Sequence, residues 1–328
     1  GTTSIQQFLL TNQQKLIAQE KIYYTDEGLI GCAHHTIAWM FQKNTVSPMG
    51  DMLVFPELGA EHFFKDIIES THKLNCDKII ISSEDFCALQ PDEIKQLVSV
   101  IQRHQVDVKI IAYLRRQDEY LESAYNTQVK WWATRYKLDF SDYCNSHTPN
   151  INYFSVIEEW GKLLGVDNII LKPFNHETSL GGDVRKDFCN TLDINWAELE
   201  FRQEKANRSL APQTLEFLRI INNLEIPKEE HIKVIRRLLE YDKLEELPKC
   251  VLFSPNERVD FINMLVESNK ALGKYNQDLG LCISPDKTLL DKNIKSLTKK
   301  EFDKIFQFVF NGKKPIWHRI LEIAKRPK

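Results

Sequence analysis

The sequence predicts an α/β fold in which a parallel sheet is flanked by helices and followed by a helical C-terminal portion. Three apolar runs have the length and composition of buried strands (78–83, 108–114 and 168–172). The first run ends in small polar residues, and two arginines follow the second. Segments with helical periodicity alternate with these runs, which is the order expected when helices connect parallel strands. After about Leu210 the strand patterns disappear and only helical patterns follow.

The first expected helix runs from Ser4 to about Gln19, because its apolar residues recur on one face and no Pro or Gly interrupts it. Thr2, Thr3 and Ser4 are residues of the kind that caps a helix start. A long helix is also expected after Arg115-Arg116, ending near Tyr136. Further helices in this half of the chain are expected at 34–42, 60–73, 91–104, 153–164 and 182–192.

The second part of the chain is expected to be helical. The sequence predicts a division into an α/β core at 1–205 and a helical C-terminal portion at 206–328 that packs on this core. Its expected helices lie at 214–223, 231–241, 258–275 and 299–310.

The composition is that of an ordinary globular protein. The 328 residues are 42% hydrophobic and carry a formal net charge of −3, which disfavours a general nucleic-acid or membrane-surface binder. Apolar runs are all too short for a membrane span. The seven cysteines are scattered without metal-ligand spacing, so we expect neither a disulfide framework nor a metal site, and a cytoplasmic location.

One candidate anion site lies at Gly1-Thr2-Thr3-Ser4, at the start of the first helix. A glycine allows the backbone to approach an anion closely, and the free N–H groups of a helix start bind phosphate or sulfate oxygens. The hydroxyls of Thr2, Thr3 and Ser4 add donors. The same residues also fit a simple helix cap, and this alternative stays open.

A second candidate anion site combines Arg115 with Ser123. Arg115 follows an expected strand, where open α/β sheets bind ligands, and Ser123 comes eight residues later on the following helix. A guanidinium and a hydroxyl there suit one phosphate group. The alternative is that the arginine forms a salt bridge or interacts with a helix dipole.

Together the two motifs resemble those of P-loop sulfotransferases. The tract GTTSIQQFL is similar to the second half of their 5′-phosphosulfate loop, and YLRRQDEYLESAYNTQVK is similar to their 3′-phosphate motif. Three further stretches resemble the bacterial, carbohydrate-type branch of this family. They are the His34-His35 pair, NIILKPFNHETSLGGDVRKDF and NRSLAPQTLEFLRIINN. The resemblance covers residues 1 to 280 or so. It implies a P-loop-type sheet and a sulfotransferase-like nucleotide-binding core.

The resemblance also implies a reaction. The donor would be 3′-phosphoadenosine 5′-phosphosulfate, and its sulfuryl group would pass to a hydroxyl or amine of an acceptor such as a carbohydrate or glycoconjugate. Gly1, Thr2, Thr3 and Ser4 would hold the 5′-phosphosulfate, and Arg115 and Ser123 the 3′-phosphate, without a metal. The family's loop lysine and its central strand would lie upstream of Gly1, so we expect a chain truncated within this loop.

An acceptor hydroxyl must lose a proton as it attacks, so a base is expected near the transferred sulfur. Glu84 follows the apolar run IIISS, and His34 and His35 titrate near neutrality. The alternatives are that Glu84 serves a helix dipole and that one histidine is a core residue and the other a surface residue.

Two other functions compete with sulfuryl transfer. A different P-loop enzyme, such as a kinase or NTPase, would need a lysine followed by Ser or Thr after the loop glycines, and Gly-Thr-Thr-Ser has no such lysine. A non-catalytic sulfotransferase-like binding protein would keep the anion sites without the chemistry.

Overall fold

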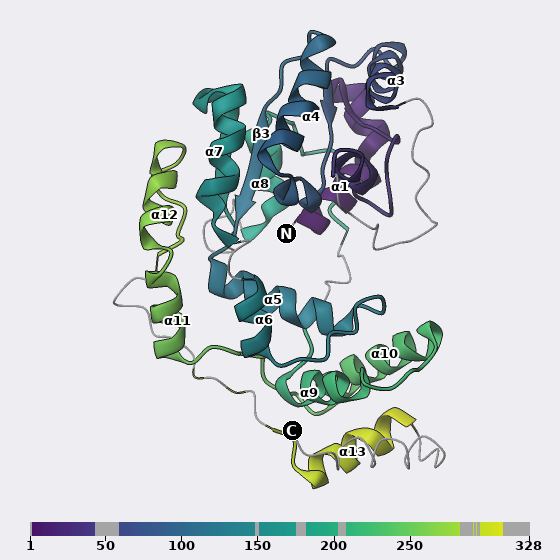
Figure 1. The fold of residues 1–328 in the computed structure, drawn as a ribbon. Helices are drawn as coiled ribbons and strands as arrows, with labels where there is room; N and C mark the ends of the chain where they lie inside the picture. Colours follow the sequence, from purple (N-terminus) through teal and green to yellow (C-terminus); the bar gives the residue numbers. More distant parts are fainter. Residues whose placement is uncertain are drawn as a thin grey trace. The chain divides into compact units, whose positions relative to one another are not determined.

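The computed structural model of the chain describes residues 2–42, 59–147, 151–174, 182–202, 208–282, 291, 293 and 296–310 (Figure 1). The chain divides into two compact units and passes between them several times, whereas the sequence suggested one division at 205/206. The first unit comprises 1–115, 152–204 and 267–281, and the second comprises 116–151, 205–266 and 282–328. Among the described helices, none is long and apolar enough to span a membrane.

The described strands all lie in the first unit and form two small parallel sheets. In one sheet β1 (Ile22–Tyr24) pairs with β2 (Lys78–Ile80), with Ile22 opposite Lys78. In the other, β3 (Ile110–Leu114) pairs with β4 (Ile169–Pro173), with Ile110 opposite Ile169.

Helices surround both sheets. The chain begins with α1 (Thr2–Lys15), which continues as a π-helical turn at Leu16–Glu20 and ends at Lys21, a residue with a left-handed φ of 56°. Pro91 and a capping box between Gln90 and Glu93 fix the start of α4. The described helices of this unit after α1 are α2 (His35–Trp39), α3 (Gly59–Lys73), α4 (Pro91–Arg103), α7 (Tyr153–Leu164), α8 (Val184–Thr191) and, apart from its first residue, α12 (Val266–Ala271).

Successive residues of the strands face two different apolar clusters. Ile79 of β2 and Ala112 of β3 pack into one cluster with α3, α4 and α7. Ile80 of β2 and Ile111 of β3 pack into the other cluster with α1 and α8. Because side chains alternate along a strand, the two sheets share the same covering layers and form one α/β/α arrangement.

The α/β class is confirmed, and each expected run contains a strand. The expectation that 78–83, 108–114 and 168–172 share one sheet is wrong, because β2 pairs with β1 while β3 pairs with β4. β1 was not expected, since a run of three apolar residues is too short to show a pattern. The sequence identifies strands by local composition, but tertiary contacts choose their partners.

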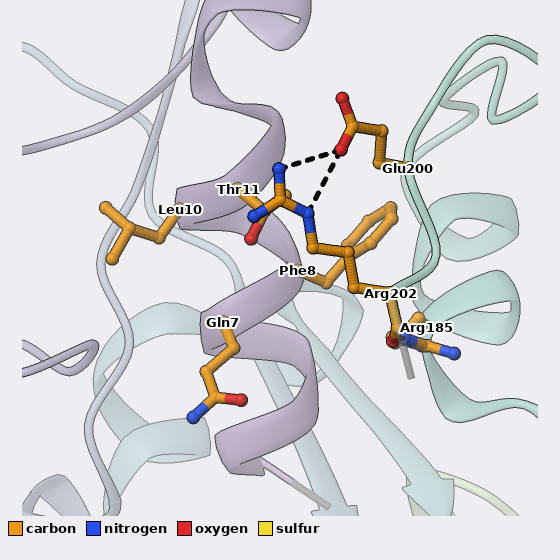
Figure 2. Close-up of a pocket in the computed structure, with 7 residues that line it drawn as sticks. All are labelled: Gln7, Phe8, Leu10, Thr11, Arg185, Glu200 and Arg202. Atoms are coloured by element: carbon orange, nitrogen blue, oxygen red, sulfur yellow. Dashed lines mark hydrogen bonds and ion pairs between the residues drawn. The ribbon is translucent and has the colours of Figure 1, made fainter. Parts of the chain in front are cut away.

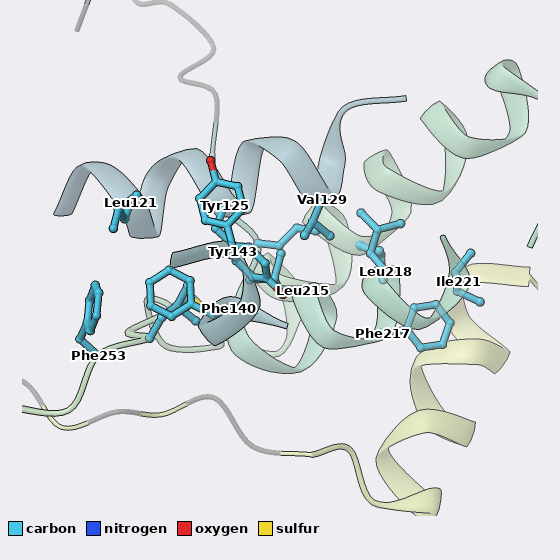
Figure 3. Packing of buried hydrophobic residues seen from close by; sticks show 14 of the residues in the cluster. Leu121, Tyr125, Val129, Phe140, Tyr143, Leu215, Phe217, Leu218, Ile221 and Phe253 are labelled. Atoms are coloured by element: carbon cyan, nitrogen blue, oxygen red, sulfur yellow. The ribbon is translucent and has the colours of Figure 1, made fainter. Parts of the chain in front are cut away.

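The regular secondary structure in the described residues of the second unit is all helical. Its apolar core joins Tyr125 and Val129 of α5 to residues of α6 and α9, and Figure 3 shows the Tyr125 ring beside Tyr143 and Phe140. The described helices are α5 (Gln117–Lys130), α6 (Phe140–His147), α9 (Pro212–Ile221), α10 (Lys228–Leu244), α11 (Pro255–Asn263) and α13 (Lys299–Phe310).

A buried histidine of α10, His231, contacts the end of α9. Asn222 donates its amide hydrogens to the carbonyls of Val129 and Tyr136, so its oxygen accepts from Nε2 of His231 at 2.9 Å. Nδ1 of His231 is buried and has no partner among the described residues. Burial lowers the pKa of His231 to about 4, with a smaller contribution from Arg135. The neutral ring is therefore part of the folded state.

This histidine predicts an acid-sensitive stability. The unfolded chain binds a proton at His231 near pH 6.5, but the folded chain does so only near pH 4. Above pH 6.5 the protonation of His231 therefore does not reduce the free energy of unfolding. As the pH drops toward 4, this residue lowers the free energy of unfolding by about 2–3 kcal/mol. Urea unfolding followed by circular dichroism between pH 7 and 4 should show this fall. His231→Gln should flatten it, and the same replacement at the exposed His62 should not.

Candidate functional site

His34 joins the carboxyl ends of β1 and β2. Its ring is fully buried, its Nε2 donates to the carbonyl of Thr25 at 2.8 Å, and its Nδ1 accepts from the backbone N–H of Ser82 at 3.0 Å. The backbone N–H of His34 donates to the Ser82 carbonyl at 2.8 Å. These partners assign the proton to Nε2. Burial lowers the pKa of His34, which keeps the ring neutral.

The two neighbouring histidines therefore differ in what they can do. Both ring nitrogens of His34 are occupied by backbone groups, so no lone pair of this ring remains for an incoming proton. His35, the first residue of α2, stays partly exposed and has a side-chain partner instead.

His35 faces the loop that follows β2. Its Nδ1 lies 2.9 Å from Oδ2 of Asp85 and 3.1 Å from Oγ of Ser83, and its ring stacks on Trp39 with 5.4 Å between centroids. The side chain is 27% exposed. The hydrogen bond to Asp85 raises the pKa of His35 against the opposing effect of burial. His35 is thus a partly exposed imidazole that pairs with a carboxylate of the loop after β2.

Glu84 begins a 3₁₀ helix in the same loop, and Gln6 connects it to α1. The buried Gln6 side chain donates from Nε2 toward Ser82 Oγ at 3.2 Å and Glu84 Oε2 at 3.4 Å. Ser83 caps the 3₁₀ helix by accepting the backbone N–H of Asp85 at 3.1 Å. We call these residues the carboxyl-edge cluster, and it comprises Gln6, His34, His35, Ser82, Ser83, Glu84 and Asp85.

The hydroxyl residues of the first anion motif lie next to this cluster along the helix. Thr2, Thr3 and Ser4 form the first turn of α1, and Gln6 lies one turn later, which is about 6 Å along the axis. Thr3 is exposed, and Thr2 and Ser4 are half-buried. Gly1 lies outside the described residues.

Arg115 stands directly after β3, at the carboxyl end of the second sheet. Its carbonyl accepts from the hydroxyl of Tyr153 at 2.9 Å, and its guanidinium lies 4.4 Å from the centre of the Phe174 ring. Arg116 differs from it, since its side chain is buried in an ion pair with Asp118 at 2.6 Å. The salt-bridge interpretation of the arginine pair therefore applies to Arg116.

Ser123 lies in α5 and belongs to the second unit, whereas Arg115 ends a segment of the first. Ser123 is half-buried, and its carbonyl accepts from the Thr127 hydroxyl at 3.0 Å. Its pairing with Arg115 on one phosphate stays a prediction.

Gln6, Ser83 and Asp85 were not expected from the sequence as site residues. The tract SSED after a strand contained a usable signal for Ser83 and Asp85, because a hydroxyl residue followed by acidic residues is typical of a capped turn. Gln6 had no such signal, since its partners are far away in the chain.

A separate cavity of about 280 Å³ is lined by α1 and by Arg185, Glu200 and Arg202, and Figure 2 shows this lining. Arg202 donates from Nε and Nη2 to one oxygen of Glu200 at 3.1 and 3.0 Å, so these two charges compensate each other. The cavity includes none of the residues predicted to bind the donor. Its lining residues are Gln7, Phe8, Leu10, Thr11, Arg185, Glu200 and Arg202. Across the described parts of the chain, no group of three or more His, Cys, Asp or Glu side chains could hold a metal ion.

No family model matches the chain, and no solved structure matches it. The chain is similar to an uncharacterized protein of Archaeoglobus fulgidus, with 31% identity over 199 residues. The matched stretch covers 59% of this chain and 52% of that protein, so the chain spans about half the length of this relative.

The contrast between the two histidines can be tested through stability. His34→Ala should lower the free energy of unfolding by about 2–4 kcal/mol, because it leaves the Thr25 carbonyl and the Ser82 N–H unpaired beside a cavity. His35→Ala should cost less than about 1 kcal/mol, because the ring is partly exposed. Urea denaturation followed by Trp fluorescence measures both. Equal losses would contradict the structural role assigned to His34.

Proposed function

We propose that the chain belongs to a P-loop sulfotransferase. It would transfer the sulfuryl group of 3′-phosphoadenosine 5′-phosphosulfate to a hydroxyl or amine, with a carbohydrate or glycoconjugate as the favoured acceptor. The observation that carries the proposal is the contact of Gln6 with Ser82 and Glu84. Through it, the start of a hydroxyl-rich helix lies beside candidate bases at the end of a parallel strand.

The second anion motif supports the same reading. Arg115 ends β3, and β3 shares its covering helix layers with β2. The carboxyl ends of parallel strands meet at one edge of such a layer, which is where α/β folds bind nucleotides. The Phe174 ring beside the Arg115 guanidinium and the Tyr153 hydroxyl on its carbonyl hold this residue in place.

The division into two sheets is compatible with a P-loop-type sheet. β2 and β3 share both apolar layers without pairing, and α4, which connects them, packs against both α3 and α7.

The chain's own residues would divide the chemistry as follows. The N–H groups and hydroxyls of Thr2, Thr3 and Ser4 would bind the sulfuryl and 5′-phosphate oxygens, and Arg115 would bind the 3′-phosphate. The acceptor oxygen forms a bond to sulfur while the bond from sulfur to the phosphate oxygen breaks, and the acceptor proton passes to a base of the carboxyl-edge cluster. A cytoplasmic location belongs to the proposal, and the seven cysteines are free thiols, a state that a reducing compartment maintains.

The direct test uses the full-length protein and a donor with a labelled sulfuryl group. Transfer of label to a glycan in the presence of a magnesium chelator supports the proposal. Magnesium-dependent turnover of ATP would instead identify another P-loop enzyme. Binding of the donor nucleotide without any transfer would identify a non-catalytic binding protein.

Arg115→Ala should weaken binding of 3′-phosphoadenosine 5′-phosphate by about 1.5–3 kcal/mol, the range of a charge-assisted hydrogen bond. It should matter much less for adenosine 5′-phosphosulfate, which lacks the 3′-phosphate. Calorimetry measures both affinities. Arg202→Ala, which removes an arginine from the separate cavity, is the matched control and should change neither. Equal losses for both nucleotides would refute the assignment of Arg115.

A further inference from the structure

The two ring nitrogens of His35 have different surroundings. Nδ1 lies within hydrogen-bond distance of Asp85 Oδ2 and Ser83 Oγ, whereas Nε2 has no partner among the described residues. An ionised carboxylate can only accept a hydrogen bond, so Asp85 fixes the ring proton on Nδ1. The lone pair of His35 is therefore on Nε2.

This geometry does not match a serine hydrolase. In a Ser-His-Asp triad the serine and the carboxylate bind opposite nitrogens of the imidazole. Here Ser83 and Asp85 both approach Nδ1. The Ser83 hydroxyl also accepts the Asp85 backbone N–H, so Ser83 shapes the turn that presents the carboxylate.

The other candidate bases are less suitable. Both ring nitrogens of His34 form hydrogen bonds with backbone groups of Thr25 and Ser82, which follow β1 and β2. Glu84 is exposed, and its Oε2 accepts a hydrogen bond from Gln6 without a second orienting group among the described residues. His35 alone among the three combines a ring held by stacking on Trp39 with a nitrogen that has no partner in the described structure.

We propose that Nε2 of His35 takes the proton of the acceptor and that Asp85 is the positioning residue that fixes its tautomer. This inference rests on the proposed sulfuryl transfer. The acceptor's O–H electrons form the new bond to sulfur, its proton moves to Nε2, and the broken S–O bond leaves its electron pair on the nucleotide phosphate. Asp85 then stabilises the imidazolium that results.

Among the described residues, few charged groups act on His35. Asp85 and Glu84 favour its protonated form, and a protonated His34 would oppose it. Asp85 acts through a hydrogen bond and its charge, and Glu84 acts through its charge alone. Glu84→Gln is therefore the matched control for Asp85→Asn.

The test reads the imidazoles directly by long-range ¹H–¹⁵N correlation on the histidine-labelled chain, with His34→Gln and His35→Gln to assign the signals. His35 should carry its proton on Nδ1 and His34 on Nε2. Asp85→Asn should lower the pKa of His35, because a carboxylate partner is lost. Glu84→Gln should lower it less. A His35 proton on Nε2, or a pKa that does not respond to Asp85→Asn, overturns the positioning role.

An activity measurement tests the base role separately. Once transfer is measured, kcat/KM should fall at acidic pH over the range in which His35 titrates; this fall is the acid limb of the pH profile. In Asp85→Asn the acid limb should move to lower pH, while the KM for the donor stays unchanged. His35→Gln should reduce kcat by about 100-fold or more. An acid limb that does not move contradicts the base role. If no transfer is detected under any condition while the tautomers are as stated, the proposed sulfotransferase function fails and the His35–Asp85 pairing stands.

Discussion

The carboxyl edge of the first sheet depends on the buried imidazole of His34. It receives one hydrogen bond from the backbone after β2 and donates another to the backbone after β1, so two loops that are far apart in the sequence are held together. A buried imidazole can do this only as the neutral ring, because it must donate at one nitrogen and accept at the other. Its burial favours that state. Every candidate base lies within a few residues of this link.

The hydrogen bonds of His34 to the two loops also explain why His34 is buried while the adjacent His35 is partly exposed. His34 precedes α2, and its side chain turns into the interior, where it contacts the Tyr24 ring edge-on. His35 begins the helix, and its side chain turns toward the Ser83–Asp85 loop, where water reaches part of the ring. Two adjacent residues thus provide a structural imidazole, His34, and an imidazole with an available nitrogen, His35.

The hydroxyl-rich start of α1 and Arg115, one part of each anion motif, depend on the layered arrangement of the first unit. α1 belongs to the layer that covers one face of both sheets, and Gln6 ties its first half to the loop after β2. Arg115 follows β3, whose other face packs on α4 and α7. A hydroxyl-rich helix start and an arginine at a strand end are each common features. Their occurrence within one α/β/α unit, with candidate bases beside the helix start, is what supports nucleotide chemistry.

The sequence by itself determined the α/β class and the position of most helices, and it supplied the candidate anion-binding and base residues. Apolar periodicity predicted 153–164 and 299–310 as helices with the ends that the structure has, because these signals are local. Tertiary structure decided the rest. It paired β2 with the unexpected β1 rather than with β3. It also assigned opposite roles to His34 and His35 and brought in Asp85, because hydrogen-bond partners 48 to 50 residues apart leave no pattern in the sequence.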